Sequence, residues 1–211
     1  RWGYFPSGSF AWRMSNESFM SRLNFVSDAK LRLSYGQTGN NRVTDFAYMS
    51  QIDLPASISY AFNNSSPQSG AILTAFGNPD LKWETTIQTN LGYDLGLFKN
   101  RINVTVDLYT KKTRDLLLLA QLPYTTGVAE AFKNIGSIRN NGLEFSINTV
   151  NINKKHFNWS SNFNISFNNN KVLSLVENQT SLLRSVLIDQ RLNSLPAYIA
   201  TIGQPIGQMY G

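Results

Sequence analysis

Residues 157–167 read FNWSSNFNISF, in which aromatic or aliphatic side chains alternate with Asn and Ser apart from one interruption. On a helix the apolar residues would scatter around the circumference, because each residue turns the chain by about 100°. On a β-strand, successive side chains point to opposite faces. The spacing therefore predicts a strand whose apolar face carries Phe157, Trp159, Phe163, Ile165 and Phe167.

Two environments suit a strand with one apolar face and one uncharged polar face. In a soluble sandwich or barrel, the apolar side chains would pack in a core. In an outer-membrane barrel they would face lipid, and the amides and hydroxyls would line a wet lumen. A membrane-crossing strand needs about 9–11 residues, and this stretch is long enough. Both environments remain open on this stretch alone.

The same alternation recurs along the chain, and no long helix is indicated. Further candidates, from regular to irregular, are found at 82–96, 101–110, 142–149, 9–14, 31–36, 47–62 and 196–203. These segments predict an all-β fold of about seven or eight antiparallel strands. A short helical turn is expected within 15–28.

Residues 82–96 and 101–110 are expected to form a hairpin around the turn LFKN. If Gly96 lies opposite Arg101, polar residues face polar ones and apolar residues face apolar ones. Asp94 then lies diagonal to Arg101, within reach of an ion pair.

The predicted connections alternate in length. The links at 97–100 and 150–156 are short, whereas those at 37–81, 111–139 and 168–195 are long. Outer-membrane barrels have short periplasmic turns and long extracellular loops. In a compact soluble domain, structureless links of this length are uncommon. The alternation therefore favours a partial transmembrane antiparallel β-barrel.

Large aromatic residues fall near the predicted strand boundaries, where outer-membrane barrels carry aromatic girdles. They are Trp83, Phe98, Tyr109, Phe157 and Trp159. Packing in a soluble core would also explain them.

The polar side chains of this protein are amides and hydroxyls more than charged groups. Charged residues make up 15% of the chain, and 24 Asn stand against 13 Asp plus Glu. Soluble domains are typically about 25% charged. The net charge of +6 is spread thinly along the sequence, so nucleic-acid binding is not predicted. The absence of Cys excludes disulfides and Cys-based metal or redox sites.

No residue pattern predicts catalysis, a metal site or a cofactor, and the chain is not expected to be an enzyme. His156 is the only histidine, which removes His-based triads and multi-His metal sites. Four carboxylates fall on the polar faces: Glu84, Asp94, Asp107 and Glu144. We expect these to pair with Arg32, Arg101 or Arg139 rather than to form a glycosidase-like pair.

The long links carry aromatic and amide side chains that would suit sugar or peptide binding. The aromatic ones are Tyr48, Tyr60, Phe62, Phe76, Tyr124 and Phe132. The same side chains would also suit packing against a partner protein or against one another. The substrate-binding residues therefore stay unassigned.

Several long motifs resemble the SusC/RagA family of TonB-dependent outer-membrane transporters of Bacteroidetes. They are RWGYFPSGSFAWRMS (1–15), SYGQTGNNRV (34–43), NPDLKWETTIQTNLGYDLGLFKNRINVTVDLYTKKTRDLLL (78–118), LPYTTG (122–127), NIGSIRNNGLEFSINT (134–149) and FNWSSNFNISFNNNKVLSL (157–175). The resemblance covers nearly the whole chain and is to the C-terminal barrel region of that family.

The resemblance implies a large barrel in the outer membrane, a plug domain inside it and a TonB-binding segment near the N-terminus. It also implies a SusD-like lipoprotein over the extracellular mouth and import of glycans, oligopeptides or other bulky nutrients. The plug and the TonB-binding segment are not found here, so residues 1–211 are expected to form part of one barrel domain. A soluble β-sandwich carbohydrate-binding module, and a passive porin or adhesin, are the alternatives.

The barrel interpretation predicts which side chains share each face. The lipid-facing surface should carry Ile87, Leu91, Val104, Val106, Phe145, Phe163 and Ile165. The lumen should be lined by Asn90, Asn103, Glu144 and Asn162.

Overall fold

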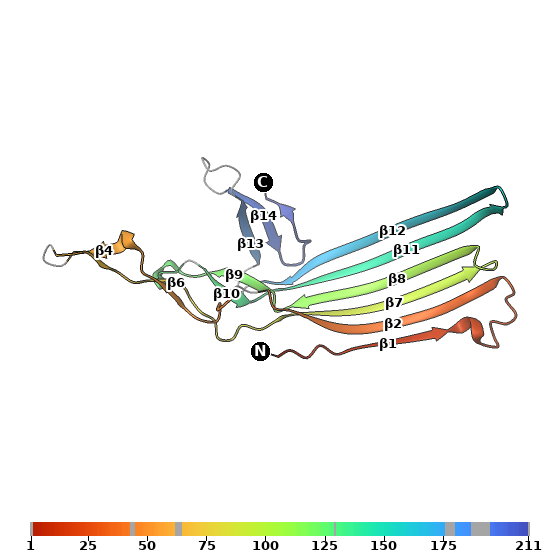
Figure 1. Ribbon diagram of the computed structural model, residues 1–211, viewed down its shortest axis with the longest axis horizontal. Coiled ribbons are helices and arrows are strands. Elements are labelled where there is room, and N and C mark those ends of the chain that lie inside the picture. Colours follow the sequence, from red (N-terminus) through yellow and green to blue (C-terminus); the bar gives the residue numbers. More distant parts are fainter. Residues whose placement is uncertain are drawn as a thin grey trace.

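A six-stranded antiparallel sheet, here named the wall, dominates the computed structural model (Figure 1). The structure describes residues 2–42, 45–61, 65–128, 130–175, 180–186 and 195–210. The wall strands, in spatial order, are β1 (Ser7–Arg13), β2 (Val26–Asn40), β7 (Glu84–Leu97), β8 (Ile102–Arg114), β11 (Ser137–Lys154) and β12 (Phe157–Ser174). Spatial order follows chain order, so the wall is an up-and-down meander with β1 and β12 at its edges.

Small sheets lie in the links between wall strands. They pair β3 (Gln51–Asp53) with β6 (Ile72–Ala75), β4 (Ser59–Tyr60) with β5 (Gln68–Ser69), and β9 (Leu117–Gln121) with β10 (Glu130–Asn134). A three-stranded sheet contains β13 (Ser181–Val186), β14 (Leu195–Thr201) and β15 (Gln208–Met209). In the described part of the chain, the helical segments are the 3₁₀ turns η1 (Met14–Asn16), η2 (Ala56–Ile58) and η4 (Tyr124–Thr126). Within the described ranges, no helix has the length and apolar character needed to cross a membrane.

The predicted alternation of short and long links is confirmed. Residues 98–101 join β7 to β8, and residues 155–156 join β11 to β12. These turns lie at one end of the wall, together with the link 14–25 that contains η1, and the small sheets lie toward the other end (Figure 1). We name the two ends the short-turn end and the long-loop end.

Two expected strands do not join the wall, which has six strands rather than seven or eight. Residues 196–203 do overlap β14, but β14 pairs with β13 and β15 in its own sheet. The segment 47–62 contributes only the short strands β3 and β4.

The predicted register of the β7–β8 hairpin was wrong by two residues. Gly96 lies opposite Asn103 instead of Arg101, and Asp94 lies opposite Thr105. The physical reason is that strand side chains repeat with period two, so a two-residue slip leaves every side chain on its original face. Alternation therefore predicts the faces correctly but does not choose between such registers.

The paired registers place apolar side chains in continuous rows across the wall. One row runs through Phe10, Leu33, Leu91, Leu108, Leu143 and Phe167, and the next through Trp12, Leu31, Tyr93, Val106, Phe145 and Ile165. All of the side chains predicted to face lipid lie on this face, and those predicted to line the lumen lie on the other. Phe163 and Phe167 on the apolar face are 56% and 58% exposed. The apolar face is thus not covered by another layer of the described structure.

Aromatic residues gather at the short-turn end of the wall. Trp12 and Phe19 make an edge-on contact with ring centroids 6.1 Å apart, and Phe25 lies 6.4 Å from Phe98. Phe157 and Trp159 begin β12 at the same end and are more than half exposed. Tyr109 differs from the girdle prediction, because it lies on the polar face within β8.

Candidate functional site

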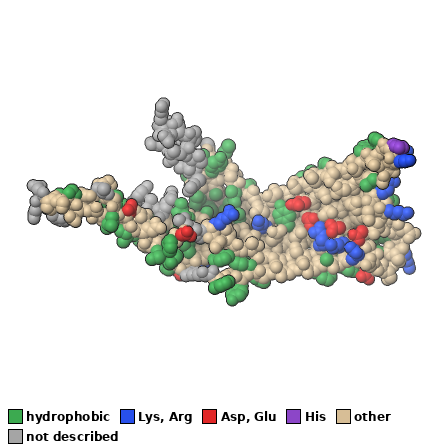
Figure 2. All heavy atoms as spheres, in the orientation of Figure 1, with side chains coloured by type: hydrophobic (Ala, Val, Ile, Leu, Met, Phe, Trp, Pro, Cys, Tyr) green, Lys and Arg blue, Asp and Glu red, His purple; other side chains and the backbone are tan. Residues whose placement is uncertain are grey.

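The polar face of the wall carries a cluster of opposite charges near its centre. Figure 2 shows acidic and basic side chains gathered in the middle of the wall. Arg32 Nε donates to Asp94 Oδ2 at 2.8 Å, and Arg32 Nη2 donates to Asp94 Oδ1 at 3.0 Å. Arg32 Nη2 also donates to Asp107 Oδ2 at 3.1 Å. We name Arg32, Asp94 and Asp107 the charge cluster. It links three neighbouring strands, β2, β7 and β8.

A glycine makes this reach across strands possible. Arg32 lies directly opposite Gly92, and Gly92 lies directly opposite Asp107 on the next strand. A Cβ at position 92 would lie 2.5 Å from Arg32 Cζ, so any side chain there would displace the guanidinium. Tyr109 similarly lies over Gly142 on β11, where a Cβ would collide with its ring.

Neighbouring polar groups hold the two carboxylates in place. Thr105 Oγ1 donates to Asp94 Oδ1 at 3.2 Å, and Asn90 Nδ2 donates to Asp107 Oδ1 at 3.1 Å. Asn90 Oδ1 is buried and has no hydrogen-bond partner among the described residues. The charge cluster is therefore a fixed hydrogen-bonded network on the polar face.

The predicted ion pairs are confirmed for Arg32 only. Arg101 does not pair with Asp94: its guanidinium donates to the backbone carbonyls of Val150 and Asn151, at distances of 2.7 to 3.2 Å. The two-residue register difference places Asp94 opposite Thr105 and so farther from Arg101, which explains the error.

Glu84 and Glu144, the other two carboxylates predicted to lie on the polar face, differ in their partners. Glu84 accepts hydrogen bonds from Leu117 N at 2.9 Å and from Asn40 Nδ2 at 2.7 Å. Glu144 lies opposite Asp107, and in the described part of the chain it has no ion-pair partner. Arg139, another predicted partner, lies on the apolar face.

A polar recess of about 340 Å³ adjoins the charge cluster. Its polar lining comes from Thr105, Asp107, Glu144, Ser146, Asn164 and Ser166. Two carboxylates beside hydroxyls and an amide would suit hydrogen-bond donors or a cationic group of a passing ligand.

Hydrogen bonds of two asparagine side chains connect the long links 41–83 and 115–136. Asn134 Nδ2 donates to the carbonyls of Lys82 and Asp115 at 2.7 and 3.0 Å, and Asn134 Oδ1 accepts from Lys82 N at 2.7 Å. Asn78 Nδ2 adds a bond to the carbonyl of Phe132 at 3.0 Å. We name this arrangement the Asn134 clasp.

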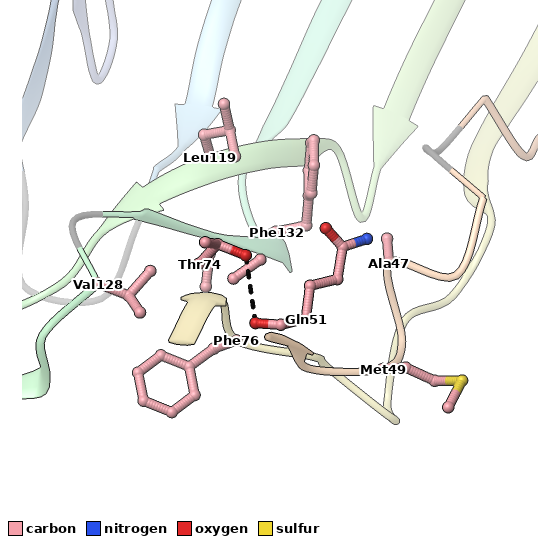
Figure 3. A pocket seen from close by; sticks show the side chains of 10 residues that line it. Ala47, Met49, Gln51, Thr74, Phe76, Leu119, Val128 and Phe132 are labelled. Carbon is pink, nitrogen blue, oxygen red and sulfur yellow. Dashed lines mark hydrogen bonds between the residues drawn. The ribbon is translucent and has the colours of Figure 1, made fainter. Parts of the chain in front are cut away.

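A loop pocket of about 360 Å³ lies between the same two links (Figure 3). It is lined by Ala47, Met49, Gln51, Thr74, Ala75, Phe76, Leu119, Val128, Ala131 and Phe132. Thr74 Oγ1 donates to the Gln51 carbonyl at 3.2 Å, and the other lining side chains are mostly apolar. The pocket suits an apolar group with a polar end.

Two of the aromatic residues singled out from the sequence, Phe76 and Phe132, line the loop pocket. Tyr48 and Tyr60 are exposed outside it, and Phe62 lies outside the described residues. Tyr124 falls in η4. No sequence signal marks the small apolar lining residues, because single Ala and Val residues in the long links show no periodicity.

Comparison with known proteins agrees with this geometry. The family model for the TonB dependent receptor-like β-barrel matches residues 1–208. TonB-dependent receptor P3 of Formosa agariphila is 38% identical over 218 residues, covering all of this chain and 20% of that protein. TonB-dependent receptor SusC of Bacteroides thetaiotaomicron is 40% identical over 185 residues, covering 83% of this chain and 18% of that protein.

Solved structures give the same result. The structure of the RagAB peptide transporter matches with a TM-score of 0.79 and 27% identity, covering 96% of this chain and 20% of that one. The RagAB peptide importer in its 'open-open' state matches with a TM-score of 0.80 and 27% identity, over the same shares of the two chains. The chain spans about a fifth of the length of these relatives. The chain therefore belongs to the TonB-dependent receptor β-barrel family, in its SusC/RagA group.

Proposed function

We propose that this chain forms part of the barrel wall of a TonB-dependent importer of bulky nutrients in the outer membrane. The observation that carries the proposal is the set of apolar rows that cross all six wall strands without interruption. In water, a continuous exposed apolar surface favours association. In lipid, it is the surface that a barrel must present, with polar groups turned to the lumen.

The open edges of the wall support a place within a larger barrel. Strands β1 and β12 each have a wall neighbour on one side only. Unpaired backbone groups at such an edge are costly in lipid, so flanking strands of the same protein would pair with them. In this proposal, residues 1–211 belong to one barrel domain, and the plug and TonB-binding segment lie elsewhere in the protein.

The proposed substrates are glycans or oligopeptides, and the proposed partner at the extracellular mouth is a SusD-like lipoprotein. The relatives include SusC and a peptide transporter, which supports an importer of large nutrients. The loop pocket and the polar recess offer apolar and hydrogen-bonding surfaces on a substrate's route. A soluble carbohydrate-binding sandwich is disfavoured by the exposed apolar rows, and a passive porin or adhesin by membership of a TonB-dependent family.

Uptake by the full-length protein in a Bacteroidetes host tests the proposal. Cells would be given labelled oligopeptides or glycans, with the TonB system intact or deleted. We expect uptake of one of these classes, and we expect it to be lost without TonB. Uptake that continues without TonB would favour a passive porin. A protein that stays monodisperse and cooperatively folded without detergent would contradict the membrane barrel.

A further inference from the structure

Three basic side chains form a row on the apolar face at the long-loop end of the wall. Arg139 on β11 lies directly opposite Lys112 on β8 and directly opposite Lys171 on β12. We name these three residues the basic row. All three are exposed, and none has an ion-pair partner among the residues that the structure describes.

The basic row lies on the same face as the apolar rows. Lys112 follows Val104, Val106 and Leu108 on the even-numbered side of β8, and no bulge interrupts the pairing of β8 with β11. Lys171 follows Ile165 and Phe167 on β12, again without a bulge between them. The three cations therefore project from the face that we propose to contact lipid.

Polarity rises in steps along this face toward the long-loop end. The row Leu91, Leu108, Leu143 and Phe167 is followed two residues later by Thr89, Thr110, Asn141 and Asn169. Two residues after that comes the basic row on β8, β11 and β12, with Ile87 beside it on β7. Thr110 Oγ1 donates to Asn141 Oδ1 at 2.6 Å, which leaves the Asn141 amide nitrogen to act as a donor. Apolar, amide and cationic rows follow one another as hydrocarbon, interface and headgroups do in a bilayer.

The height of the basic row matches a membrane boundary. Ten residues separate Ile102, at the start of β8, from Lys112. At about 3.3 Å per residue this is roughly 33 Å along the strand. A strand tilt of about 40° reduces it to roughly 25 Å, the height of the apolar band of an outer-membrane barrel. Lys112 thus lies where the hydrocarbon ends, on the side where such barrels carry their long loops.

Three like charges on adjacent strands attract an anion. Neighbouring strands are about 4.8 Å apart, so the backbone positions of the basic row span roughly 10 Å. Like charges directly opposite each other on a sheet repel. Guanidinium and ammonium groups bind phosphate by charge-assisted hydrogen bonds. We propose that Lys112, Arg139 and Lys171 bind the phosphorylated headgroup of an outer-leaflet lipid. This inference rests on the proposed outer-membrane barrel.

Lipid binding by the purified full-length protein in detergent tests the inference. The probes are phosphorylated lipid A and the same lipid A without its phosphates, with binding measured by native mass spectrometry. A variant with Lys112→Gln, Arg139→Gln and Lys171→Gln is compared with a charge-matched control, Lys99→Gln, Lys154→Gln and Lys155→Gln, at the short-turn end. We expect the first variant to lose affinity for the phosphorylated lipid by roughly tenfold or more. The control should bind as the wild type does.

Any other outcome would overturn a stated part of the inference. Equal binding of the two lipids by a well-folded wild type would refute the lipid site and leave the proposed importer intact. Competition by millimolar inorganic phosphate would indicate a phosphate site in place of a lipid site. Heat-modifiable migration on gels checks folding of the variants. If the triple variant does not fold, the single Arg139→Gln variant replaces it, and unchanged binding by that variant would refute the inference.

Discussion

Removing the cation at the centre of the charge cluster should destabilise the barrel. In Arg32→Met, Asp94 and Asp107 lose three charge-assisted hydrogen bonds of 2.8 to 3.1 Å. The two carboxylates would then lie on adjacent strands with Glu144 opposite Asp107, and Lys30, opposite Asp94, would be left as a neighbouring cation. Asp94 would keep its bond from Thr105, so the network would not be lost entirely.

The size of the effect follows from the exposure of the cluster. Hydrogen bonds to charged groups contribute about 1.5–3 kcal/mol each when well shielded. Here the side chains of Arg32, Asp94 and Asp107 are 30%, 31% and 20% exposed, so solvent screens part of the interaction. We therefore expect the free energy of unfolding to fall by about 1.5–3 kcal/mol in total, well below the sum of three shielded bonds.

Denaturant titration of the full-length protein in detergent micelles measures this change. A double-mutant cycle with Asp94→Asn isolates the pair and should give a coupling of about 1–2 kcal/mol. Lys111→Met is the control, because Lys111 is an exposed cation in the same sheet with no salt bridge among the described residues. A loss below about 0.5 kcal/mol, as for an ordinary surface substitution, would refute the structural role of the cluster.

Four further substitutions test other parts of the structure. Gly92→Ala should destabilise the barrel by less than the loss of Arg32 does, because the new Cβ makes the flexible guanidinium shift but leaves its charge beside the carboxylates; an effect as large as that of Arg32→Met in an unfolding titration would contradict this. Glu144→Gln should raise the free energy of unfolding by about 0.2–1 kcal/mol, because it removes a like charge opposite another carboxylate. A decrease in the free energy of unfolding in the same titration would contradict this. Asn134→Ala should release the clasp between the two long links, seen as faster hydrogen exchange there with an unchanged wall. Leu91→Arg should lower stability by about 2–4 kcal/mol if the apolar face meets lipid, and a neutral effect on unfolding from liposomes would argue against that placement.

Much of the wall could be predicted from the sequence, because the alternation of apolar and polar residues shows which side chains share one face of a strand. The strands around FNWSSNFNISF, the two faces and the unequal links followed from period-two spacing alone. The register of β7 against β8 did not, because slipping by two residues preserves both faces.

The parts of the candidate site that depend on contacts between distant residues were not predictable. The position of Arg32 over Gly92 requires the registers of three strands to be known together. The loop pocket combines residues from two long links whose short strands are not marked by a clear alternation in the sequence. Asn134, which forms the clasp, is one of 24 asparagines in the chain, and its hydrogen-bond partners are far away in the sequence.

The fit between Arg32 and Gly92 also bears on how the barrel assembles. Hydrophobic matching alone would accept β7 and β8 in either of two alignments. In the alignment offset by two residues, with Gly96 opposite Arg101, Asp107 would lie opposite Asn90 instead of Gly92 and would move away from the guanidinium. The three-strand ion network forms in one alignment only. The network therefore stabilises the observed pairing of β7 with β8 relative to the shifted one, after hydrophobic collapse has brought the strands together.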